Sequence, residues 1–130
     1  MAGLKFLLEL PLVLRQRRLS SERAQMTRDQ FVHETASTEL GKLAAAHLWD
    51  KLFALKVHGD FTPYPSDSLL NVYGLAEDDL DVDIIMDILK RLNCAVPDQA
   101  TVDAIGAINT PADVVRFVEA SCSRSAPSLP

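Results

Sequence analysis

The chain of 130 residues has no long hydrophobic run, and this lack excludes a membrane-spanning helix. Its most apolar stretch, from Leu4 to Leu14, is interrupted by Lys5, Glu9 and Pro11. It falls well short of the roughly 20 apolar residues that a helix needs to cross a bilayer. We therefore expect no transmembrane segment.

Cysteine is scarce as well, with Cys94 and Cys122 as the only two in the sequence. Neither belongs to a C-x-x-C pair or has a histidine at metal-ligand spacing, so no metal site is expected. Cys94 follows an apolar helical pattern, whereas Cys122 lies near a small polar tail. We interpret both as free structural thiols, the usual state in a reducing compartment.

The motifs of common active sites are also missing. The sequence has no nucleophile elbow, no phosphate-binding glycine loop and no paired-carboxylate signature, so an enzyme is the weakest class of function. A helical enzyme that uses His47 or His58 is the alternative, because Asp50 lies one helical turn from His47. A lone histidine on a packed helix is more often structural.

Three acids imitate part of a calcium-binding loop. Asp79, Asp81 and Asp83 match the first, third and fifth ligands of an EF-hand. Ile84 then occupies the position that requires glycine, and Lys90 the position of the bidentate glutamate. We therefore expect no calcium site.

Charge is divided unevenly along the chain. Residues 1–30 contain six basic and three acidic residues and so have a formal charge of +3. Because the net charge of the whole chain is −5, the remaining residues carry −8. An acidic body repels phosphate backbones and attracts basic protein surfaces. Nucleic-acid binding by the main domain is therefore not expected.

The N-terminal residues 1–26 differ from the rest of the chain, because an apolar stretch is followed there by basic residues. Positive charge follows the apolar stretch at Arg15, Arg17 and Arg18, whereas a secretory signal has its positive charge first. The pattern favours a mitochondrial targeting segment, or else an arm that docks on a partner. We expect this arm to contact another protein or to be cleaved after import, and we expect residues 121–130 to form a flexible tail.

No run shows the alternation of a half-buried strand, so the expected class is all-α. Helices are predicted near 27–57, with a break near Gly41, and near 79–93, 98–107 and 111–120. Thr27 and Gln30 make a capping box at the first start, and two prolines make residues 61–68 a loop. The expected core contains Leu48, Leu52, Leu80, Ile84, Ile88, Leu92, Val114 and Phe117.

The helix near 79–93 has more acids at its front than its cap requires. The helix dipole favours acids in the first turn, but Asp83 and Asp87 lie further in and share the outward face with Asp79. The alternative is an ordinary solvated face. We predict a docking surface for a basic partner, made of Glu77, Asp78, Asp79, Asp81, Asp83, Met86 and Asp87.

From Tyr73 to Asp98 the pattern resembles the acidic second helix of the acyl carrier protein family. Val72-Tyr73-Gly74 stands at the family's Asp-Leu-Gly, Val96-Pro97-Asp98 at its Ile-Pro-Asp, and Thr110-Pro111 opens a segment like its last helix. The apolar positions that match are Val82, Ile84, Ile85, Met86, Leu92, Val114, Val115, Phe117 and Val118. The resemblance covers residues 40–120 and implies a four-helix bundle, here over 27–120 and preceded by the arm.

The chain departs from the family at the attachment site for 4′-phosphopantetheine. The ungapped register places Asp78 at the family's serine, and no serine occurs between Leu69 and Ala120. A carboxylate cannot form that phosphodiester, so we expect no cofactor. Ser68, in Asp67-Ser68-Leu69, is the alternative attachment site if it heads a long second helix.

Family members also serve as structural subunits of mitochondrial respiratory complex I, held by small basic helical partners. The resemblance therefore implies a non-catalytic interaction subunit in a multisubunit assembly on the matrix side. The alternative is a working phosphopantetheine carrier that uses Ser68.

Overall fold

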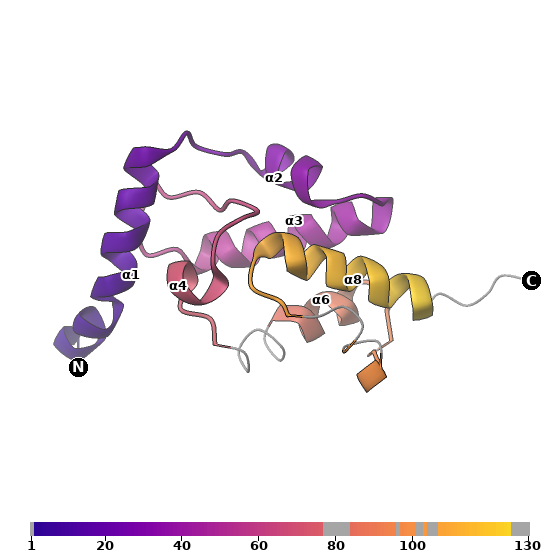
Figure 1. Ribbon diagram of the computed structural model, residues 1–130. Coiled ribbons are helices and arrows are strands. Elements are labelled where there is room, and N and C mark those ends of the chain that lie inside the picture. The colour runs from indigo at the N-terminus through magenta and orange to yellow at the C-terminus, as the bar shows by residue number, and fades with distance from the viewer. Residues whose placement is uncertain (1, 77–83, 96, 101–102, 104–106, 126–130) are drawn as a thin grey trace, which may run out of the picture.

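The structure, a computed structural model, describes residues 2–76, 84–95, 97–100, 103 and 107–125. These residues form helices and loops without any strand, as the sequence predicted. None of the helices in these ranges is long and apolar enough to cross a membrane. The helices, shown in Figure 1, are α1 (Ala2–Glu22), α2 (Arg28–Thr35), α3 (Glu39–Leu55), α4 (Leu69–Tyr73), α6 (Met86–Arg91) and α8 (Pro111–Ser125).

The segment predicted as one helix over 27–57 is two helices. The capping box at the start of α2 is confirmed, because the Thr27 side chain accepts from Gln30 N and the Gln30 side chain accepts from Thr27 N. α2 then ends at Thr35, and Thr38 caps a new helix by accepting from Gly41 N at 2.9 Å. The break therefore comes before the predicted position at Gly41, because Thr38 is extended and ends the helical path.

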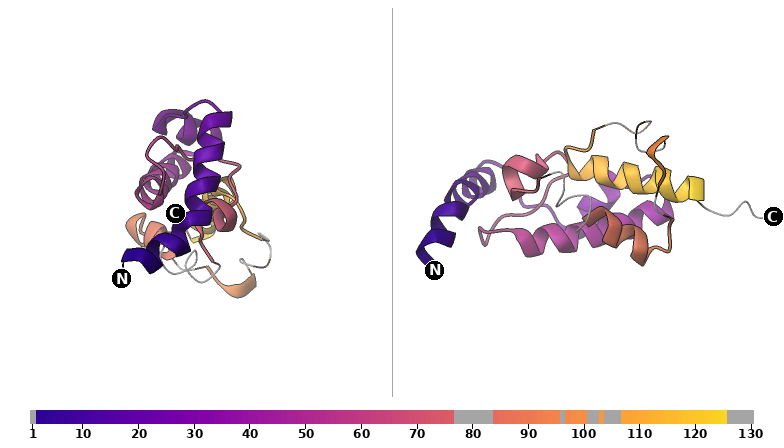
Figure 2. Two further views of the ribbon diagram at one scale, coloured as in Figure 1. Left: turned by 90° about the vertical axis from the view of Figure 1, so that its left-hand side faces the viewer. Right: turned by 90° about the horizontal axis from the view of Figure 1, so that it is seen from below.

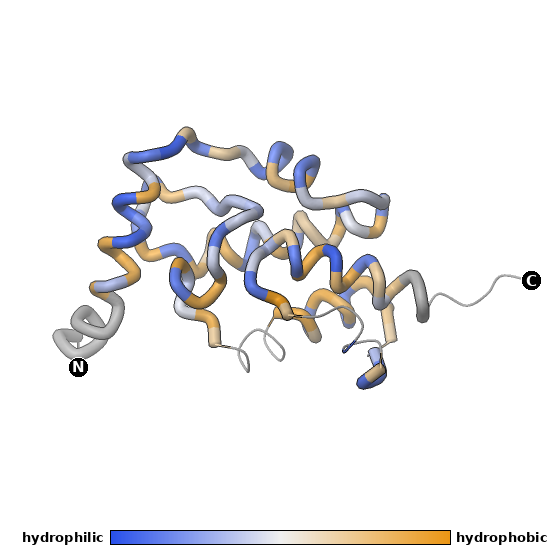
Figure 3. Tube along the Cα trace, in the orientation of Figure 1, coloured by the Kyte–Doolittle hydropathy of each residue, from blue (hydrophilic) through white to orange (hydrophobic). Residues whose placement is uncertain are grey.

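The core lies between α3, α6 and α8, with α2 packed on α3 (Figure 3). Most of the predicted core is confirmed, and Leu92 is only partly buried. Leu80 and the other residues of 77–83 lie outside the described residues. The confirmed core residues are Leu48, Leu52, Ile84, Ile88, Val114 and Phe117.

The loop after α3 ends in the short helix α4. Ser68 caps α4, and Gly74 ends it in the left-handed conformation at φ 71°. Hydrogen bonds from Gly74 N to Leu70 O and from Leu75 N to Leu69 O close the turn. α4 is therefore separate from α6, the next helix that the structure describes.

Of the helix predicted near 79–93, the structure describes the part from Ile84 onward. One wider helical turn at Ile84 and Ile85 leads into α6, and Asn93 ends it at φ 57°. Cys94 N then donates to Leu89 O at 2.9 Å. The sequence predicted a helix end near this point, where Asn93 tolerates the left-handed conformation.

The prediction of free thiols is wrong in this structure. Cys94 after α6 and Cys122 in α8 form a disulfide, with their Cα atoms 5.2 Å apart. The packing of α6 on α8 brings the two residues together across 28 positions of sequence. The pattern predicted both helices but not the register in which they pack.

α1 lies at one end of the molecule, where it packs against α4 (Figure 2). The polar side chain of Gln16 is fully buried, Leu19 packs against the core, and Arg23 is largely covered. We expected the whole segment 1–26 to stand apart from a bundle that is complete without it. That expectation is wrong for the second half of α1, because this half is packed against the loop before α4.

Candidate functional site

The predicted acidic docking surface is described at Met86 and Asp87 only. Met86 on α6 is 39% exposed, while its neighbours Ile84, Ile85 and Ile88 are buried. The helix therefore directs one face to the core and Met86 away from it. Glu77, Asp78, Asp79, Asp81 and Asp83 lie outside the described residues.

Asp87 already has partners within the chain. Its Oδ2 lies 2.9 Å from Lys51 Nζ of α3 and 3.0 Å from Arg91 Nε one turn further along α6. The hydrogen bonds from Lys51 and Arg91 lower the pKa of Asp87. Asp87 therefore joins α6 to α3. Its negative charge is already balanced by Lys51 and Arg91 before any partner binds.

Ser68 does not head the helix that contains Ile84 and Ile88. Its half-buried hydroxyl accepts a hydrogen bond from Asn71 N at 3.1 Å and so caps α4. α4 ends at Tyr73, and the left-handed conformation of the next residue, Gly74, blocks a continuous helix. The geometry on which the Ser68 alternative depended is therefore absent.

The carboxylate of Asp50, which the sequence suggests as a partner for His47, forms an ion pair with Arg28. Both oxygens of Asp50 accept from Arg28 of α2, each at 3.0 Å. This bidentate contact holds the pKa of Asp50 below its usual value. Asp50 therefore fastens α2 to α3 on the surface of the molecule.

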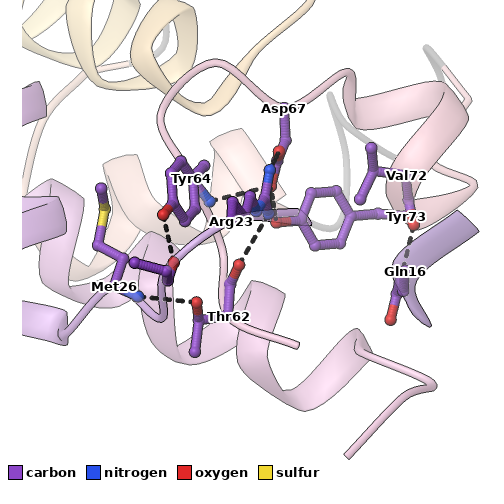
Figure 4. A network of polar contacts seen from close by, with 9 residues as sticks. Gln16, Arg23, Met26, Thr62, Tyr64, Asp67, Val72 and Tyr73 are labelled. Atoms are coloured by element: carbon purple, nitrogen blue, oxygen red, sulfur yellow. Dashed lines mark hydrogen bonds and ion pairs between the residues drawn. The ribbon is translucent and has the colours of Figure 1, made fainter. Parts of the chain in front are cut away.

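Asp67, which the sequence did not single out, is the centre of a buried polar cluster in which its carboxylate accepts four hydrogen bonds (Figure 4). Arg23 donates to both of its oxygens, Nη1 to Oδ1 at 2.6 Å and Nη2 to Oδ2 at 3.1 Å. Tyr64 N and the Tyr73 hydroxyl each donate to Oδ2 at 2.9 Å. Four donors surround a carboxylate whose residue is only 4% exposed.

The guanidinium of Arg23 is held from several sides. Nη2 also donates to Thr62 O at 2.9 Å, and the cation lies 3.8 Å from the ring centre of Tyr64 and 5.0 Å from that of Phe61. Tyr64 in turn donates its hydroxyl to Ala24 O. Planar stacking and a bidentate contact suit arginine and not lysine.

Burial and the neighbouring carboxylate of Asp67 raise the pKa of Tyr73 far above its ordinary value. The phenol therefore stays protonated and donates to Asp67. Because each polar group of this cluster is used to hold another group of the chain, the arrangement is a structural lock between α1 and the loop before α4. It leaves no carboxylate oxygen poised for proton transfer.

Gln16 of α1 makes a second set of hydrogen bonds that attach this helix to the rest of the chain. Its Nε2 donates to Val72 O at 2.8 Å, and its Oε1 accepts from Val57 N at 2.9 Å and from His58 N at 3.3 Å. The side chain thus satisfies three backbone groups, one in α4 and two in the loop after α3. The partners lie 41 to 56 positions away, so no local pattern could identify them.

Among the ranges that the structure describes, no three His, Cys, Asp or Glu side chains gather to hold a metal. The comparisons with known proteins add no relative: no protein-family model matches the chain, and no curated protein or solved structure matches it.

Proposed function

We propose that the chain is a non-catalytic, acyl-carrier-like interaction subunit of a larger mitochondrial assembly, such as a respiratory complex on the matrix side. In this proposal the segment from Glu77 to Met86 docks a basic helical partner. One observation supports it above the others: Ile84 and Ile85 in the turn before α6 and Ile88 in α6 are buried, while Met86 is left exposed next to a run of acids in the sequence. In such a surface Met86 would supply the apolar contact and the acids a charged rim around it.

The position of Ser68 supports a subunit without a prosthetic group. The serine caps a separate short helix, and the position that matches the family's attachment site is Asp78. Intact-mass measurement of the purified native protein tests this part. We expect the mass of the unmodified chain, and a phosphopantetheine increment that disappears in Ser68→Ala would establish the carrier instead.

The ion pairs of Asp87 change the design of the docking experiment. Asp79 and Asp83 are the acids to replace, whereas Asp87 serves as a matched control because Lys51 and Arg91 already pair with it. We expect Asp79→Asn with Asp83→Asn to weaken incorporation into the native assembly at least tenfold in competition with the parent. Asp87→Asn should affect incorporation much less.

In the same assay, the dependence of incorporation on salt concentration distinguishes charge-dependent recognition from nonspecific association. Attraction between exposed charges falls as ionic strength rises. Incorporation of the parent should therefore weaken with salt more steeply than that of the double variant. Equal incorporation of the parent and the double variant at low salt would leave the acids as a solvated face and contradict the proposal.

A further inference from the structure

The disulfide between Cys94 and Cys122 joins two sites of different exposure. Cys94 is half-buried after the end of α6, between the exposed residues Asn93 and Ala95. Cys122 in α8 is buried, with 5% of its surface exposed. α6 and α8 lie side by side, so the bond links two neighbouring helices (Figure 1). A small thiol in solution can therefore reach the bond from the side of Cys94.

The core can accommodate Cys122 with or without the bond. Val114, Val118 and Cys122 recur at steps of four residues and are all buried, so Cys122 continues the apolar stripe of α8. A free cysteine behaves as a small apolar side chain and is often fully buried in proteins. The reduced Cys122 can therefore keep its place in the core, while the reduced Cys94 lies near the surface.

The end of α6 depends on the bond more than its beginning does. Ile88 and Leu89 are buried and hold the middle of the helix on the core. In the described stretch 90–95, only Leu92 and Cys94 pack against the core, and the other four residues are exposed. A helix of six residues is too short to be stable by itself. Its last turn is therefore held in place largely by the covalent link at Cys94.

We propose that the bond between Cys94 and Cys122 is a reversible thiol–disulfide switch, which fixes the last turn of α6 to α8 when it is oxidised and releases this turn when it is reduced. In reducing compartments, the disulfides that do form are usually transient and catalytic or redox-sensing. One accessible sulfur and one buried sulfur suit such a switch, because exchange depends on access and begins at the accessible sulfur.

The switch operates by thiol–disulfide exchange with a thiol such as glutathione. In reduction, a glutathione thiolate attacks Cys94 Sγ, and the electron pair of the broken bond goes to Cys122, which takes up a proton because a buried thiolate is poorly solvated. A second glutathione displaces Cys94, so glutathione ends as its disulfide and the protein as two thiols. In oxidation, Cys94 displaces one thiol from glutathione disulfide, and Cys122 displaces the other as the bond re-forms.

Release of the last turn also affects the docking surface proposed above, because Met86 lies in the same short helix. This consequence rests on the proposed function. The switch itself is tested on the full chain without any partner, so either proposal can fail alone.

Thiol alkylation of the full chain in glutathione buffers tests whether the bond responds to redox state. The buffers range from an oxidising ratio to the reducing ratio of a cytosol, and acid quenching with denaturation exposes every thiol before mass spectrometry counts the labels. We expect no labelled thiol at the oxidising end and two at the reducing end. Trp49, 7% exposed, should keep the fluorescence of the folded chain throughout. A bond that stays intact in the reducing buffer, or that never forms in the oxidising one, would overturn the switch.

Backbone dynamics test whether the bond holds the last turn of α6. In the oxidised chain, the NMR order parameters of Asn93 and Cys94 should be near the value of a rigid backbone, about 0.85. In the reduced chain they should fall below about 0.6, while Leu48, fully buried in α3, stays rigid. Cys94→Ser is the control, because without the bond its last turn should be flexible in both buffers.

Two results of the dynamics experiment would contradict the switch. Equal order parameters in the oxidised and reduced parent would show that the bond does not hold the end of α6. Loss of rigidity at Leu48 on reduction would show that the bond supports the whole fold instead of one turn.

Discussion

Arg23 and Asp67 form the most deeply buried ion pair among the described residues, with side chains that are 18% and 3% exposed. Removing one member of such a pair leaves the other charge in a poorly solvated place. The same carboxylate also orients Tyr64 and Tyr73. The pair therefore decides whether α1 and the loop before α4 stay together.

The first prediction follows from this pair. Arg23→Ala should lower the free energy of unfolding by about 3 to 5 kcal/mol, because Asp67 is left buried without its cation. Urea denaturation followed by circular dichroism measures the change. Arg17→Ala, at an exposed arginine of α1, should stay within about 0.5 kcal/mol of the parent. Similar losses in the two variants would show that the pair has no special weight.

Glu119 gives the second residue-scale prediction, which concerns acid stability. Its carboxylate accepts from Thr38 N at 2.8 Å, Thr38 Oγ1 at 2.7 Å and Ser37 N at 2.9 Å, and so closes the N-terminal end of α3 from α8. Burial raises the pKa of Glu119, but the hydrogen bonds from Thr38 and Ser37 outweigh it and lower the pKa below 4.5.

A carboxylate with a lowered folded-state pKa stabilises the fold above its unfolded pKa and loses that contribution as pH falls. The stabilisation by Glu119 is therefore present above about pH 4.5 and fades below it. Glu119→Gln should be less stable than the parent at neutral pH, by about 1 to 2 kcal/mol as for a lost helix cap. Thermal unfolding from pH 7 to pH 3 should show the difference shrinking, and a constant difference would contradict this role.

At the scale of whole elements, the disulfide ties the end of α6 to α8. It closes a loop of 28 residues, which the chain-entropy relation converts to about 3 to 4 kcal/mol. Replacing Cys94 and Cys122 together by Ala should lower stability by about this amount, and reductant should bring the parent to nearly the same level. Mass spectrometry after thiol alkylation of the unreduced native protein checks the bond, since two labelled thiols would contradict it.

Periodicity predicted the core-facing parts of α3, α6 and α8, because each buries a broad apolar face that a 3.6-residue repeat reveals. The helix predicted to end at residue 120 continues to Ser125, so the prediction of a flexible tail is wrong for residues 121–125. Ile84, Ile88, Val114 and Phe117 are buried as expected. It failed between α2 and α3, where Thr38 ends one helical path and caps the next. That break depends on Glu119, some 80 residues away, which a local pattern cannot register.

The candidate sites were harder to predict than the helices. Asp87 was recognised as an outward acid, but its pairing with Lys51 on another helix was not. Gln16, Arg23 and Asp67 were missed as a group because polar residues in a basic segment and a loop give no apolar signal. Contacts of this kind depend on how distant helices and loops pack together. The spacing of residues within a short stretch of sequence does not reveal that packing.

At the scale of the whole molecule, α1 belongs in part to the folded unit, which changes what truncation should do. Residues 2–11 precede the first fastening at Gln16, whereas residues 12–25 contain Gln16, Leu19 and Arg23. Loss of the longer piece would uncover Val72 O, Val57 N and His58 N and would leave Asp67 without its cation. The two truncations therefore separate the projecting part of α1 from the packed part.

The last prediction is that deletion of residues 2–11 leaves the free energy of unfolding within about 1 kcal/mol of the parent, whereas deletion of 2–25 lowers it by at least about 4 kcal/mol. The larger loss combines a buried unpaired carboxylate with backbone groups that lose their hydrogen bonds. Urea denaturation of both truncated chains measures the difference.

A targeting segment removed after residue 25 would leave the mature protein with that loss, so N-terminal sequencing of the native protein should find a first residue at or before Leu12. A shortened chain from residue 26 that is as stable as the parent would show instead that the lock on Asp67 is dispensable and that the arm can be removed.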